Sequence, residues 1–135
     1  MKTLIKSSLV AFAVITSNIS LANNVSPEFL INEIDTVYKQ YLHGSPEVST
    51  YALESFVRLL ESDQSTELLQ KTGPSNLAFS YIRLGFLYEK SGLKQKAAKV
   101  FSRGVASYKS PHNKDVAVTL SELKSVVNQL DAKNS

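Results

Sequence analysis

The most constraining feature of this chain is the spacing of apolar and small residues between Ala78 and Pro111. A helix predicted over 74–90 gathers large apolar side chains on one side, at the steps of three and four that an α-helix repeats. These side chains are Leu77, Tyr81, Leu84 and Tyr88. Gly92 follows them, where glycine commonly ends a helix in the left-handed conformation, and a second helix is predicted over 94–109. The pattern therefore predicts an antiparallel helix pair.

Three small residues lie where the two helices of this pair would meet. Gly85 sits in the middle of the first helix, and Ala97 and Gly104 lie on the apolar side of the second. A glycine inside a helix costs about 1 kcal/mol relative to alanine. That cost is tolerable where a neighbouring helix approaches too closely for a side chain, so we expect a tight contact at these positions.

This order and spacing resembles one tetratricopeptide (TPR) repeat, a helix-turn-helix unit of about 34 residues. The matching pattern is Tyr81-x2-Leu84-Gly85-x2-Tyr88, then Gly92, then Ala97-x3-Phe101 and Gly104. Two positions depart from the family, because Tyr81 replaces the usual tryptophan and Pro111 falls slightly late. TPR units stack into surfaces that hold other proteins, so the resemblance implies a protein or peptide partner rather than catalysis.

In the family, the first helix of each repeat lines a concave groove. The resemblance places six residues of this chain on that candidate face: Phe79, Ile82, Arg83, Phe86, Glu89 and Lys90. Three of them are large and apolar, so this helix is apolar nearly all round and must be covered on every side. Two interpretations are open. Either the segment 30–41 or the terminal helix fills the groove, or a partner segment docks there, since exposed apolar patches commonly mark interaction sites.

The preceding part of the chain predicts a second helix pair. Ser26-Pro27-Glu28 and Ser45-Pro46-Glu47 each combine a capping serine, a proline at the first helical position and an acid at the positive helix end. Gly44 separates the two helices. The second carries its apolar residues at Val48, Ala52, Phe56, Leu59 and Leu60. Its Ala52-x3-Phe56 weakly echoes Ala97-x3-Phe101, with an unrelated hairpin as the alternative, and a short helix is expected over 66–72.

A last helix is predicted over 113–130, with apolar residues at alternating steps of four and three. These residues are Val116, Leu120, Leu123, Val127 and Leu130. Such a helix can cover the end of a repeat array, which otherwise exposes an apolar face; the alternative is a short coiled-coil seam with a second chain. No segment reads as a strand. The expected fold is therefore all-α, with antiparallel helix pairs of TPR-like type and a C-terminal capping helix.

The first 22 residues resemble a secretory signal peptide. Lys2 and Lys6 precede a short apolar run at 9–15, and Ser20-Leu21-Ala22 suits cleavage after Ala22. The apolar run is shorter than the roughly 20 residues that span a bilayer. We therefore expect a single helical domain over 23–135 that is periplasmic or secreted and not inserted in a membrane.

The remaining composition excludes several kinds of function. Removing the predicted signal peptide takes away two lysines and no acid, so the formal net charge falls from +3 to +1 and no basic footprint for nucleic acid is left. The chain has no cysteine, and His43 and His112 stand alone, without a metal-binding or catalytic spacing. We expect no enzymatic activity, cofactor or metal. The alternative to an adaptor is a self-associating assembly factor or structural subunit of the cell envelope, including a homodimer.

Overall fold

The computed structural model describes residues 26–62, 76–108 and 116–135. Within these ranges the fold is all-α, as predicted, and no strand occurs. The helices are α2 (Pro27–His43), α3 (Pro46–Ser62), α5 (Asn76–Lys90), α6 (Lys94–Ser107) and α7 (Leu120–Asn134). The predicted signal peptide and the short helix expected over 66–72 lie outside the described residues.

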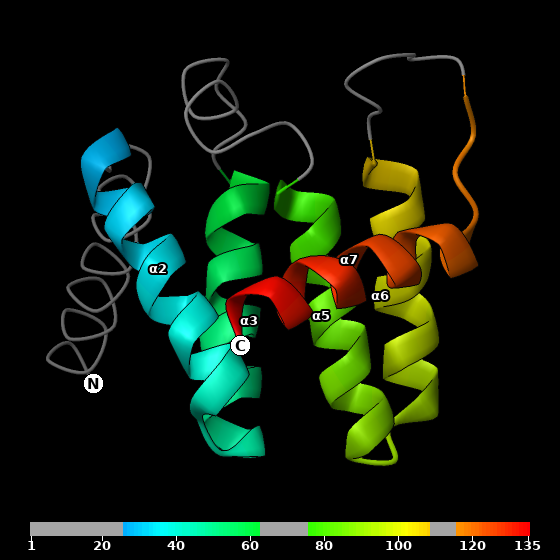
Figure 1. The fold of residues 1–135 in the computed structure, drawn as a ribbon, viewed down its shortest axis with the longest axis horizontal. Coiled ribbons are helices and arrows are strands. Elements are labelled where there is room, and N and C mark those ends of the chain that lie inside the picture. Colours follow the sequence, from blue (N-terminus) through cyan, green and yellow to red (C-terminus); the bar gives the residue numbers. More distant parts are fainter. Residues whose placement is uncertain (1–25, 63–75, 109–115) are drawn as a thin grey trace, which may run out of the picture.

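The helices α2, α3, α5 and α6 stand side by side in chain order, and each runs antiparallel to its neighbour (Figure 1). The helix α3 packs against both α2 and α5, and α5 and α6 form the most extensive contact. The last helix, α7, crosses this row over α5 and α6, and its C-terminal end reaches toward α2 and α3 (Figure 1). The arrangement is a row of two antiparallel helix pairs with one face covered by a crossing helix.

The predicted helix starts of the first pair are confirmed. The Ser26 hydroxyl accepts a hydrogen bond from the Phe29 backbone N–H at 3.3 Å, and the Ser45 hydroxyl accepts one from Val48 at the same distance. Each bond satisfies a backbone donor that has no partner within its own helix. In the second pair, Gly92 adopts a positive φ of 76° and turns the chain from α5 into α6.

The expected close contact between α5 and α6 is also present. A Cβ atom placed on Gly85 would lie 2.2 Å from Cε1 of Phe101, and one placed on Gly104 would lie 2.9 Å from Cδ1 of Ile82. Both glycines therefore leave room for a side chain of the opposite helix. Ala97 is buried at the same junction.

The buried side of α3 differs from the predicted one. Its buried residues are Ser49, Leu53, Phe56, Val57 and Leu60, whereas Val48 is exposed and Ala52 is only partly buried. Ser49 can be buried because its hydroxyl donates a 2.6 Å hydrogen bond to the Gln40 carbonyl of α2, and Leu53, Val57 and Leu60 continue the same side at steps of three and four. Ser49 is the fourth residue of α3, and Ala97 is the fourth residue of α6. By this count Ser49, rather than Ala52, corresponds to Ala97.

The terminal helix begins later than predicted. It starts at Leu120 rather than near Asn113, and Val116 is 59% exposed instead of lying on an apolar side. The start is set by a capping box, in which the Thr119 hydroxyl accepts from the Glu122 N–H and the Glu122 carboxylate accepts from the Thr119 N–H. The helix packs inward through Leu123 and Val127, which are buried among the other helices.

Candidate functional site

Apolar residues of the candidate face on α5 are packed inside the protein. Ile82 is fully buried, and its Cδ1 atom lies against Gly104 of α6. The rings of Phe79 and Phe86 are partly buried. Phe79 lies 6.2 Å from Tyr108, and Phe86 meets Phe101 edge to face at 5.9 Å, centroid to centroid. These contacts place the three apolar residues in the core or at its edge.

Arg83 is held between α2 and α7. Its Nε and Nη2 atoms donate hydrogen bonds of 3.0 and 2.9 Å to Oδ1 of Asp131 on α7. The guanidinium also lies 4.7 Å from the ring centre of Tyr38, whose hydroxyl donates a 3.0 Å hydrogen bond to the same carboxylate oxygen. Burial is the main reason why the pKa values of Tyr38 and Tyr41 are raised, and Asp131 adds to it. A largely buried ion pair with aromatic neighbours thus joins three helices.

Glu89 forms a second ion pair between α5 and α7. Its carboxylate forms a 3.2 Å ion pair with Nζ of Lys124. The same ammonium lies 4.0 Å from the ring centre of Phe101 and 5.8 Å from that of Phe86, so it also makes cation–π contacts. Lys90, at the end of α5, is exposed.

Together these contacts show how the chain covers most of the candidate face on α5, although Glu89 and Lys90 stay exposed. The terminal helix lies across it, as one of the two interpretations of the sequence expected, and α2 adds the aromatic rings over Arg83. A partner could therefore bind the Arg83 guanidinium only by displacing Asp131 of α7, and Ile82 is enclosed in the contact between α5 and α6.

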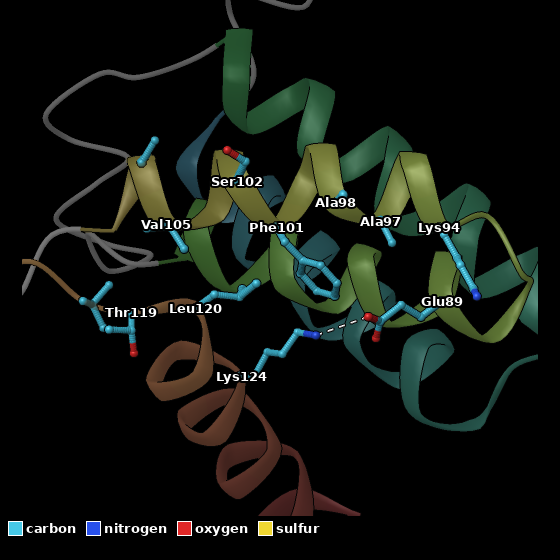
Figure 2. A pocket seen from close by; sticks show the side chains of 12 residues that line it. Glu89, Lys94, Ala97, Ala98, Phe101, Ser102, Val105, Thr119, Leu120 and Lys124 are labelled. Atoms are coloured by element: carbon cyan, nitrogen blue, oxygen red, sulfur yellow. Dashed lines mark hydrogen bonds and ion pairs between the residues drawn. The ribbon is translucent and has the colours of Figure 1, made fainter.

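An open groove lies elsewhere, between α6 and the segment that leads into α7 (Figure 2). Its volume is about 1000 Å³. Small and apolar side chains form most of its lining, with Glu89, Lys94 and Lys124 at one end. On the α6 side it is lined by Lys94, Ala97, Ala98, Phe101, Ser102, Val105 and Ala106, and on the other side by Val118, Thr119, Leu120 and Lys124. We refer to this feature as the α6 groove.

The α6 groove was not predicted from the sequence, because Ala97 and Phe101 were expected to face the first helix of the pair. A signal was present: Ala98, Ser102 and Ala106 are small and recur at steps of four, which places them along one side of the helix. All three are exposed in the structure. The pattern alone could not separate an open groove from a side covered by another helix.

The junction between α3 and α5 shows how the two helix pairs are joined. Val57 and Leu60 of α3 are buried there. At its edge the hydroxyl of Tyr81 donates to the Glu61 carboxylate, and that of Tyr88 donates to the Glu54 carboxylate. Burial and these hydrogen bonds raise the pKa of each tyrosine to about 12. The junction is therefore an apolar contact closed by hydrogen bonds to acidic residues of α3.

The described residues contain no group of three His, Cys, Asp or Glu side chains that could hold a metal ion. None of the helices in the described part of the chain is long and apolar enough to cross a bilayer. No family model, curated protein or solved structure matches the chain. The TPR resemblance thus rests on residue spacing.

Proposed function

We propose that this chain is an exported, TPR-like protein-interaction module that binds a protein or peptide segment. The observation that carries the proposal is the α6 groove, an open and mainly apolar depression at the end of the row of helices. Contiguous apolar surface left open on a small protein commonly marks an interaction site. The spacing of residues 78–111, which resembles a TPR repeat, supports the same class of function.

Two residues of the candidate face contribute to this function by holding α7 in place, and Glu89 also lines the α6 groove. Arg83 and Glu89 bind Asp131 and Lys124 of α7, and so hold α7 beside the α6 groove. The shape of the groove then depends on both ion pairs, because Lys124 and the start of α7 form one of its walls.

Self-association through the terminal helix is less well supported. Leu123 and Val127, the central residues of the predicted seam, are 1% and 0% exposed within a single chain. A coiled coil with a second copy would have to remove them from the core.

A photo-crosslinking amino acid tests the proposal. Placed at Ser102, on the α6 groove, it should capture a partner protein in living cells of the native host. Placed at Ser125, which is exposed on α7 and does not line the groove, it should capture little. Equal capture from both positions, or none from Ser102, would argue against the α6 groove as the binding surface.

Export rests on the pattern of residues 1–22. Mass spectrometry of the mature protein should find an N-terminus at Asn23. A chain that still begins at Met1 and remains with the cytoplasmic fraction would refute this part of the proposal.

A further inference from the structure

The two helix pairs provide a comparison for the uncovered side of α6. Counted from the first residue of each helix, Val57 of α3 corresponds to Val105 of α6, and Glu54 corresponds to Ser102. In α3 this side is covered by α5, through the buried Val57 and through the hydrogen bond from Tyr88 to Glu54. In α6 the same side opens into the α6 groove. Within the described ranges, no helix lies along this side of α6 as α5 lies along α3.

The shape of the α6 groove suits another helix. Ala98, Ser102 and Ala106 run along it at steps of four, and such short side chains allow a helix to approach closely. The 14 residues of α6 extend about 20 Å, so about four turns of a bound helix could contact it. Val105 and Leu120 supply larger apolar surface on either side.

The charge of the α6 groove favours an acidic occupant. Its lining carries two cations, Lys94 and Lys124, and one acidic residue, Glu89. The other cations of α6 do not line it, and Arg103 forms an ion pair with Glu61 of α3. Leu93 precedes the helix without a side-chain capping bond, and the first turn has no acid to offset its positive end. Glu89, the acidic residue that lines this end, is already paired with Lys124. Lys94 therefore leaves positive charge at the mouth of the groove.

We propose that the α6 groove binds an amphipathic helix of a partner protein, whose narrow apolar stripe is flanked by acidic residues. This inference rests on the proposed interaction function and names the chemistry of its partner. A second copy of the chain is the alternative occupant. The exposed large apolar residues of α2, Phe29 and Ile31, project from different sides of that helix, but Val48 and Tyr51 of α3 are three positions apart and share one side. A second copy is therefore included below as an outcome of the test.

Three synthetic peptides test the proposal against the purified protein. Each is a helix of about 18 residues, long enough to form in water. All three carry the same stripe of leucine and alanine. They differ in the residues that flank the stripe, which are glutamate in the first peptide, glutamine in the second and lysine in the third. Fluorescence anisotropy at about 50 mM salt, where screening of exposed charges is modest, should show the glutamate peptide binding at least about tenfold more tightly than the lysine peptide.

Two charge reversals on the same helix provide matched variants. Lys94→Glu should lower the affinity for the glutamate peptide about tenfold and raise the affinity for the lysine peptide, because Lys94 lines the groove. Lys99→Glu makes the same change in net charge at an exposed position that does not line it, and should alter affinity less than about threefold. Lys94→Glu should remain folded, since an acid in the first turn favours the helix.

The possible failures are distinguishable. No binding by any peptide, equal affinity for the glutamate and lysine peptides, or equal losses from the two variants would overturn the assignment of an acidic helix. If a crosslinker at Ser102 still captures a partner, only this assignment fails and the interaction function stands. If it captures a second copy, and sedimentation shows a dimer that Ala98→Glu dissociates, the occupant is the chain itself.

Discussion

Replacement of Gly85 by alanine tests the α5–α6 contact on which the fold depends. On helix propensity alone, Gly85→Ala should stabilise the protein by about 1 kcal/mol. The structure predicts the opposite sign, because the new Cβ would lie 2.2 Å from Cε1 and 2.5 Å from Cδ1 of Phe101. The ring cannot simply swing away, since Phe86 packs against it and Lys124 lies over its face. Overpacking of this kind costs about 1 to 3 kcal/mol.

The expected net effect of Gly85→Ala is therefore a loss of up to about 2 kcal/mol, the difference between these two contributions. Urea denaturation followed by circular dichroism measures the change. The matched background is Phe101→Leu, which removes Cε1 and Cζ, two of the ring atoms closest to the new methyl group. Leucine keeps a Cδ1 atom, but its shorter side chain can turn away from the new methyl group, so Gly85→Ala should be clearly less destabilising in this background.

The difference between the two backgrounds isolates the contact from the effect of the glycine itself. A coupling of at least about 1 kcal/mol is expected. Stabilisation by Gly85→Ala in the parent protein, or the same effect in both backgrounds, would mean that Phe101 does not lie against Gly85 and would refute the packing described here.

Other changes test the remaining contacts. Asp131→Asn should lower the free energy of unfolding in urea by about 2 to 4 kcal/mol, because it leaves the largely buried Arg83 without its counter-charge; an unchanged midpoint would contradict the pair. Phe86→Ala should cost about 2 to 3 kcal/mol in the same assay, less than a fully buried phenylalanine; a cost near zero would place its ring outside the core. The raised pKa values of Tyr81 and Tyr88 predict stability that is present below pH 10 and is lost toward pH 12, as the folded state resists releasing their protons. Denaturation at several pH values should show a shallower decline in a double Tyr→Phe variant, and an unchanged decline would exclude these tyrosines as its cause.

Local features of the fold could be predicted from the sequence because they depend on neighbouring residues. Ser26 and Ser45 cap helices whose first residues follow at once, and Gly92 turns the chain within three residues of both helices. The contact of Gly85 with the second helix was also predictable, because a short turn brings the two helices together. The start of α7 was missed, since the apolar spacing extends back to Val116 while the capping box at Thr119 decides where the helix begins.

The position of α7 could not be predicted from local patterns. It depends on contacts such as that between Arg83 and Asp131, which lie far apart in the sequence. Before these contacts are known, Arg83 could equally face a partner's carboxylate. The α6 groove was hidden for the same reason, because it exists only where α7 crosses the row and leaves the outer side of Ser102 uncovered.

Hydrogen exchange in the presence of the glutamate-flanked peptide shows whether a partner binds the α6 groove while α7 stays packed on the candidate face of α5. We expect slower exchange of backbone amides over 94–106 and 118–124, with the α7 amides around Asp131 unchanged or slower. Faster exchange throughout α7, together with protection of α5 around Ile82 and Arg83, would show instead that the peptide displaces α7 and binds the candidate face, which would contradict binding in the α6 groove.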